Sequence, residues 1–151
     1  MQWKRNLLKN SLILFFILGQ AYLSFGQTTF QHDTEDEHYL LLLASPLTNM
    51  DEWVAAMSQY NAQHFPQRGL KIQRATIQLA KKERVILVKS FPNLQEAENY
   101  WLHLRKNNAS GIAKTIAQNF WLITPTNLNK VLLAKSMKAY QQYFDRYYIL
   151  K

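Results

Sequence analysis

Residues 84–104 read R-V-I-L-V-K-S-F-P-N-L-Q-E-A-E-N-Y-W-L-H-L. The run from Val85 to Val88 is apolar at every position, which is typical of a central strand covered on both faces. Pro92 ends this strand, and Asn93 stands three residues before Glu96, as at the start of a capped helix. Apolar residues then recur three and four positions apart, which predicts an amphipathic helix. These residues are Leu94, Ala97, Tyr100, Trp101 and Leu104.

The same layout occurs a second time in residues 38–57, H-Y-L-L-L-L-A-S-P-L-T-N-M-D-E-W-V-A-A-M. The apolar run is Tyr39–Ser45, Pro46 ends it, and Asn49 stands three residues before Glu52. Helical spacing then continues to about Phe65 and predicts a second amphipathic helix. Its apolar positions are Met50, Trp53, Val54, Met57 and Tyr60.

Two further strands complete the predicted fold. Residues 70–79 alternate loosely between polar and apolar, and a short polar turn at 80–83 joins them to the next strand as a hairpin. Residues 120–124 are aromatic and β-branched, which predicts a fourth strand. The order βαββαβ indicates an α+β, ferredoxin-like domain over residues 38–125: a four-stranded antiparallel sheet with two helices on one face.

Both ends of the chain lie outside this unit. Residues 1–26 have a basic start, a short apolar run and small residues before Gln27, which predicts a cleavable export signal and a periplasmic protein. The apolar run is shorter than the roughly 20 residues that span a bilayer, so a membrane anchor is disfavoured and no transmembrane segment is expected after cleavage. Residues 27–37 are polar and acidic and are predicted to be a disordered lead-in. Residues 126–151 predict a helical extension, with a short helix at 127–133 and an aromatic final helix that Ser136 caps.

The charges are unevenly distributed. Residues 1–26 hold three basic and no acidic residues, so the formal charge of +8 becomes +5 for the remainder. No Lys or Arg occurs between Gln27 and Phe65, whereas residues 68–84 hold six basic residues against Glu83 alone. In an exported protein this basic band favours acidic lipids, glycans or an acidic protein over nucleic acid. A solvated strand edge with its hairpin loop is the simpler explanation of the same pattern.

The sequence contains no recognisable catalytic, cofactor-binding or metal-binding pattern. It has no Cys, so disulfides and thiolate chemistry are excluded. The His residues lie apart in the sequence, with His64 near a helix end and His103 expected on the exposed side of its helix. His32, Glu35 and His38 share an acidic segment, but nothing fixes their geometry as metal ligands. We therefore predict a non-catalytic protein with no catalytic residues, no cofactor and no metal.

These motifs resemble two families. Residues 39–45 and 85–91, with the Asn-capped helices, are similar to the SPOR-type peptidoglycan-binding domain, which is also ferredoxin-like. Over residues 38–148 the chain more closely resembles the C-terminal domain of the PorW/SprE family, periplasmic lipoproteins of the type IX secretion and gliding machinery. This resemblance is carried by H-Y-L-L-L-L, V-I-L-V-K-S-F with N-x-x-E-A, F-W-L-I-T and the Tyr/Phe-rich end. The chain departs from that family in having no Cys for lipidation and no preceding helical-repeat region.

The two resemblances imply different functions. The PorW/SprE resemblance implies a free-standing interaction domain that binds a protein partner in the cell envelope, as an accessory component of type IX secretion or gliding. The SPOR resemblance implies the alternative, a module that binds the glycan strands of peptidoglycan. Nucleic acid is not an expected partner in either case.

Strand alternation predicts a candidate interface. Every second residue of the two central strands faces away from the helices, and together these side chains would form an apolar patch. We predict this patch to be Leu40, Leu42, Val85 and Leu87, with Leu41, Leu43, Ile86 and Val88 under the helices. The aromatic residues of the C-terminal extension are the other candidates: Tyr140, Tyr143, Phe144 and Tyr147. We expect the patch to be covered by this extension, because intrachain neighbours are the default, or else by a partner protein.

Overall fold

The computed structural model describes residues 29–106 and 120–149. The elements in chain order are β1 (His38–Ala44), α2 (Met50–His64), a 3₁₀ turn (Pro66–Arg68), β2 (Lys71–Gln78), β3 (Lys82–Phe91), α3 (Leu94–Lys106), β4 (Phe120–Ile123), α5 (Pro125–Ala134), α6 (Lys138–Phe144) and a π-helical turn (Asp145–Ile149). The predicted export signal at residues 1–26 lies outside the described residues and stays a prediction.

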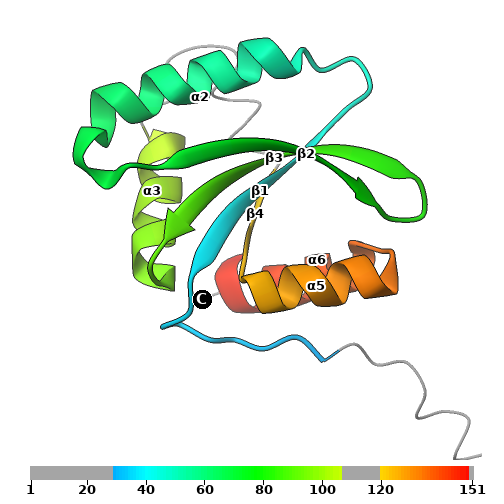
Figure 1. Ribbon diagram of the computed structural model, residues 1–151. Coiled ribbons are helices and arrows are strands. Elements are labelled where there is room, and N and C mark those ends of the chain that lie inside the picture. Colours follow the sequence, from blue (N-terminus) through cyan, green and yellow to red (C-terminus); the bar gives the residue numbers. More distant parts are fainter. Residues whose placement is uncertain (1–28, 107–119, 150–151) are drawn as a thin grey trace, which may run out of the picture.

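The four strands form one antiparallel sheet in the order β2-β3-β1-β4. The two strands predicted as central, β1 and β3, pair with each other in the middle of the sheet. In Figure 1, α2 lies above the strands while α5 and α6 lie below them. This order, with its helical crossovers, is that of a ferredoxin-like arrangement, so the predicted α+β fold class is confirmed.

The helices α2 and α3 begin where the sequence predicts. The Asn49 side chain accepts hydrogen bonds from the backbone N–H groups of Asp51 and Glu52. The Asn93 side chain accepts one from the N–H of Glu96, so both asparagines satisfy donors that the first turn of a helix leaves unpaired. The two helices contact each other through a buried hydrogen bond of 2.7 Å from the Tyr100 hydroxyl of α3 to Oδ1 of α2's Asn61.

The strand register corrects the predicted division of the sheet into two faces. Paired residues of an antiparallel ladder carry their side chains on the same face. One face holds the pairs Leu40–Val88 and Leu42–Ile86, and the other holds Leu41–Leu87 and Leu43–Val85. Arg74 lies opposite Ile86 and forms an ion pair with Asp51 of α2, so the first of these faces lies under the helices. Leu40 and Leu42 therefore face α2 and α3, and only Val85 and Leu87 of the predicted patch face away.

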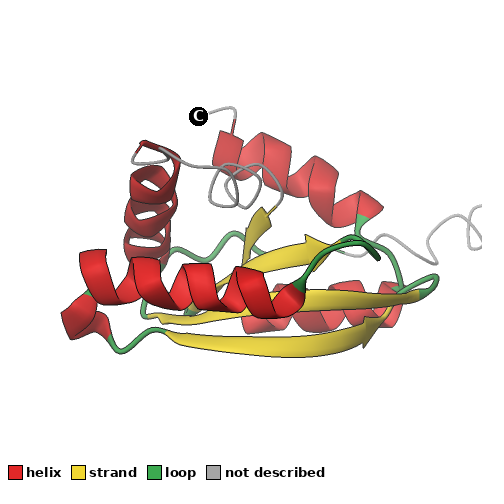
Figure 2. Cartoon of the chain, turned by 90° about the horizontal axis from the view of Figure 1, so that it is seen from above, coloured by secondary structure: helices red, strands yellow, loops and turns green. Residues whose placement is uncertain are grey.

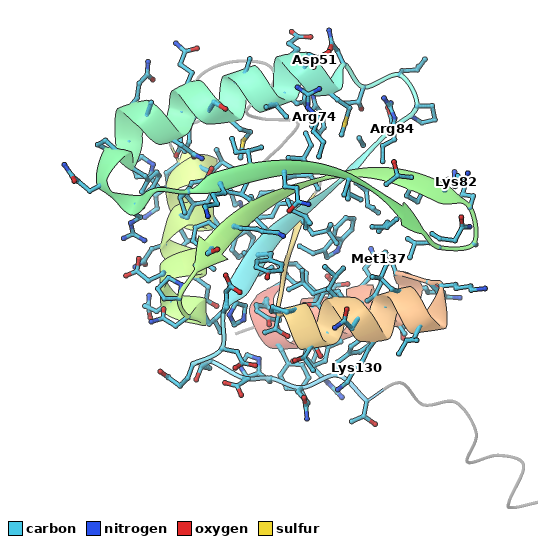
Figure 3. All side chains as sticks on the ribbon, viewed as in Figure 1. Asp51, Arg74, Lys82, Arg84, Lys130 and Met137 are labelled. Atoms are coloured by element: carbon cyan, nitrogen blue, oxygen red, sulfur yellow. The ribbon has the colours of Figure 1, made fainter. Side chains whose placement is uncertain are left out.

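The C-terminal elements cover the second face. Val131 of α5 is fully buried, and Met137, between α5 and α6, is packed against the core. The hydroxyl of Tyr140 in α6 donates a hydrogen bond of 2.5 Å to the backbone carbonyl of Leu122 in β4. In Figure 3 the side chain of Met137 lies between the sheet and these helices. The patch is thus covered by the chain's own extension, as the intrachain alternative predicts, and residues 125–149 belong to the same core as the sheet.

The acidic lead-in is a second correction, because its described part, residues 29–37, is fixed by contacts far along the chain. Asn127 of α5 exchanges two hydrogen bonds with the backbone of Gln31, at 3.0 and 2.8 Å. The Phe30 ring packs edge-on against Tyr140 with 5.0 Å between centroids. The Thr34 carbonyl accepts from the backbone N–H of Leu94 at the start of α3. A polar composition predicted disorder, but these long-range bonds attach the segment to α3, α5 and α6.

In the part of the chain that the structure describes, none of the helices has the length and apolar character needed to cross a bilayer.

Candidate protein-interaction edge

The predicted interface residues contribute to the core more than to the surface. Six of them are buried, and they are Leu40, Leu42, Val85, Leu87, Tyr140 and Phe144. Tyr143 is half-buried, and Tyr147 is the most exposed of the eight, at 39%. This burial fits the expectation that the patch is covered, because burying an apolar face inside the chain stabilises it more than leaving that face in water. That any of these residues binds a partner stays a prediction. Of these eight residues, only Tyr147 offers substantial exposed surface to a partner.

The two edges of the sheet differ. At the β4 edge, α6 lies alongside the strand, and Tyr140 bonds one of its carbonyls. At the other edge, β2 ends the sheet over eight residues, none of which is buried. Figure 2 shows β2 as the outermost strand, with no described element beyond it. An edge strand presents a row of backbone N–H and C=O groups that another strand can pair with.

Basic side chains surround this open edge, and several are already paired. Arg74 forms an ion pair with Asp51 at the start of α2, and Figure 3 shows the two side chains beside each other. One Arg84 nitrogen donates to the carbonyls of Ser45, Pro46 and Thr48, at 2.6 to 3.3 Å. These contacts hold the loop between β1 and α2 against β3, so part of the basic band has a structural role.

Lys71 and Lys89 are different, because they lie directly opposite each other in the β2–β3 ladder. Both side chains point to the same face, and like charges in this position are destabilising. The Lys89 ammonium lies 5.0 Å from the centre of the Tyr39 ring, whose electron-rich face attracts a cation. Within residues 29–106 and 120–149 neither lysine forms an ion pair with a carboxylate. The edge therefore carries uncompensated positive charge at the first residue of β2.

A pocket of about 320 Å³ opens beside the same end of β2. It lies between the C-terminal half of α2 and the start of the strand. Its walls are formed by Val54, Ser58, Asn61, Ala62, Phe65, Pro66, Gly69, Leu70 and Ile72. Leu70 and Ile72 flank Lys71 in the sequence, so the pocket is on the opposite face of the strand from the lysine pair. Gly69 has a φ of 58°, which suits glycine and turns the chain from the 3₁₀ turn into β2.

Asn61 gives this pocket a polar group with unused hydrogen-bonding capacity. Its side chain is 7% exposed, and Oδ1 accepts the bond from the Tyr100 hydroxyl. Its Nδ2 has no hydrogen-bond partner among the described residues. A buried donor without an acceptor costs about 1–3 kcal/mol, so such groups call for an explanation.

Histidines that are distant in the sequence come together at the end of α2. The rings of His64 and His103 are 4.9 Å apart, and the Tyr60 hydroxyl is 2.5 Å from Nδ1 of His103. The sequence predicts His103 on the exposed side of its helix, whereas the structure has it half-buried against Tyr60 of α2. Burial and the nearby His64 lower the pKa of His103, and burial raises the pKa of Tyr60 to about 12. In the described ranges no three His, Asp or Glu side chains are grouped closely enough to hold a metal ion.

His38 is fully buried at the start of β1. Its Nδ1 donates a 2.8 Å hydrogen bond to the Asp36 carbonyl, and the Tyr148 hydroxyl lies 3.5 Å from Nε2. Burial lowers the pKa of His38 below its ordinary value of 6.5, and this effect exceeds the opposing influence of Asp36. His32 stacks on the ring of Tyr147, and its charge also lowers the pKa of His38.

This burial predicts a pH dependence of stability. The unfolded chain takes up the His38 proton near pH 6.5 and the folded chain only at lower pH, so the free energy of unfolding should fall as the pH decreases below about 6.5. Urea unfolding at about pH 7.5 and about pH 5.5 measures this loss. We expect His38→Gln to reduce the loss. If the variant loses as much stability as the wild type between the two pH values, His38 is not the group responsible.

Comparison with protein-family models, curated proteins and solved structures finds no match to this chain. The sequence indicates the basic band and a solvated strand edge with its hairpin loop, but neither that α6 lies at the opposite edge of the sheet nor that a pocket adjoins β2. Both of these depend on how α2 and α6 pack.

Proposed function

We propose that this chain is a non-catalytic protein–protein interaction module that binds an extended, acidic segment of a partner along the outer edge of β2. The observation that carries the proposal is the asymmetry of the sheet: α6 lies at the β4 edge, whereas no described residue pairs with the outer side of β2 over its eight residues. Strand addition to an exposed edge is a common mode of peptide recognition, in which backbone hydrogen bonds supply the affinity.

The charge of the edge indicates what kind of segment it binds. A strand added outside β2 places one of its residues directly beside Lys71, on the face that also holds Lys89. Opposite charges at neighbouring positions of a sheet stabilise the pairing, and like charges oppose it. A carboxylate beside Lys71 would offset the repulsion between the two lysines. The same positive charge would disfavour pairing of β2 with another copy of itself, since the edge would then face its own charge.

The location and the machinery are part of the proposal. The basic and apolar start of residues 1–26 supports export, and the resemblance to the PorW/SprE family makes type IX secretion and gliding the setting in which we would look for the partner. Peptidoglycan binding is the weaker candidate, because the sheet face on which a glycan would lie is apolar and covered by the chain itself.

Proline substitution in β2 tests the use of this edge. Gln73 and Thr76 are an odd number of residues apart, so their N–H groups point to opposite sides of the strand. Proline at one of them removes a bond to β3, and proline at the other removes only an outward N–H. We expect one of Gln73→Pro and Thr76→Pro to keep the wild-type melting temperature and to lose peptide binding by about tenfold or more.

The probe for this test is an end-blocked peptide of nine residues with a central glutamate, a tyrosine on each side of it, and alternating threonine and valine outside. Its affinity for the full chain is measured by calorimetry, and the same peptide with a central lysine is the control. We expect the lysine peptide to bind about tenfold more weakly, and the difference to shrink at high salt. Equal binding of the glutamate peptide by the wild type and by the stable proline variant would exclude strand addition at β2.

A further inference from the structure

The pocket beside β2 adjoins the proposed binding edge at one position. Lys71 faces one side of the sheet, and its neighbours Leu70 and Ile72 face the other, where they form part of the pocket wall. A strand added outside β2 follows the same alternation. If one of its residues lies beside Lys71, the residue on either side of it is therefore directed toward the pocket. This holds for a parallel or an antiparallel partner strand.

The pocket has the features of a side-chain subsite. A volume of about 320 Å³ falls at the lower end of the range in which proteins hold small ligands or single large side chains. Its walls are mainly apolar, from Val54, Phe65, Leu70 and Ile72. Asn61 also lines the pocket, and its buried Nδ2 has no acceptor among the described residues. A bound group that is apolar along its length and ends in an oxygen atom would match both properties.

We infer that this pocket is the specificity site of the edge, and that it binds a tyrosine next to the partner's acidic residue. In this arrangement the carboxylate lies beside Lys71 on one face of the sheet. The neighbouring ring enters the pocket on the other face, and its phenolic oxygen accepts a hydrogen bond from Asn61 Nδ2. The recognised feature is an acidic residue adjacent to a tyrosine in an extended segment. The inference rests on the proposed strand addition at β2.

Three end-blocked peptides test the inference on the full chain. Each has the central glutamate, and the two residues flanking it are tyrosine, phenylalanine or alanine. We expect the alanine peptide to bind at least about tenfold more weakly than the tyrosine peptide, with the phenylalanine peptide in between. Asn61→Leu should remove the difference between tyrosine and phenylalanine, because the donor is gone while the volume is kept.

A second pair of variants guards against loss of folding in Asn61→Leu. Ala62 is exposed at the rim of the pocket, and Ala62→Phe should fill the pocket and make the three peptides bind alike. Ala55 is an exposed residue two helical turns earlier in α2, outside the pocket, and Ala55→Phe should leave the order of affinities unchanged.

The outcomes separate this inference from the proposed function. If all three peptides bind the wild type equally and the stable proline variant of β2 abolishes that binding, strand addition holds and the pocket inference is overturned. If Ala62→Phe and Ala55→Phe have the same effect on the affinities of the three peptides, the pocket inference is also overturned. If none of the peptides binds, both proposals fail.

Discussion

Phe144→Ala should lower the free energy of unfolding by about 3–5 kcal/mol, the range found for removing a buried aromatic side chain. Phe144 is 4% exposed in α6, and its ring stacks on Tyr148 with 5.0 Å between centroids. Its ring centroid also lies 6.3 Å from that of Trp101 in α3. Its removal would leave a cavity between the C-terminal helices and the βαββαβ unit, so the large effect follows from their shared core.

Leu133→Ala is the control for this prediction. Leu133 lies in α5, and its side chain is 84% exposed, so its removal should change the stability by no more than about 0.5 kcal/mol. Urea unfolding of both variants gives the comparison. A loss below about 1 kcal/mol for Phe144→Ala would show that the C-terminal helices do not pack on the sheet as described.

Leu41→Ala should lower the free energy of unfolding by about 2–5 kcal/mol. Leu41 is fully buried in β1, the strand that pairs with both β3 and β4. Its partner across the ladder is Leu87, and both side chains lie on the face that α5 and α6 cover. Because the neighbouring strands are held by backbone hydrogen bonds, the site has little freedom to collapse around the missing atoms, which places the expected cost in the upper half of the range.

Leu47→Ala makes the same chemical change a few residues later. Leu47 is 96% exposed in the loop before α2, so its loss should be close to neutral. Calorimetric melting temperatures of the two variants show the difference directly. Equal effects of the two substitutions would contradict the placement of Leu41 in the centre of the sheet.

The main features of the fold could be predicted because they depend on local patterns. Runs that are apolar at every position indicate the two central strands, and asparagine three residues before glutamate indicates both helix starts. The assignment of side chains to faces failed because β1 and β3 are joined by a long crossover, and no tight turn fixes their register. The observed pairing of Leu40 with Val88 follows from packing across the sheet, which one strand read alone does not show.

The candidate site was less predictable for a related reason. The sequence shows Tyr60 and His64 one turn apart on a helix, but the approach of His103 depends on the packing of α3 on α2. The attachment of the acidic lead-in depends on Asn127, nearly a hundred residues away. The sequence pattern allows a solvated strand edge at β2, but the position of α6 at the opposite edge, beside β4, depends on how the C-terminal helices pack.

Hydrogen exchange of the β2 backbone amides, in the full chain with and without the glutamate peptide, tests strand addition most directly. In the free chain we expect alternate amides of residues 71–78 to exchange rapidly, because their N–H groups point away from β3. Bound peptide should protect these amides while leaving the helix amides of α5 unchanged. Exchange at β2 that is the same with saturating peptide as without it would contradict the proposal that this edge binds a partner strand.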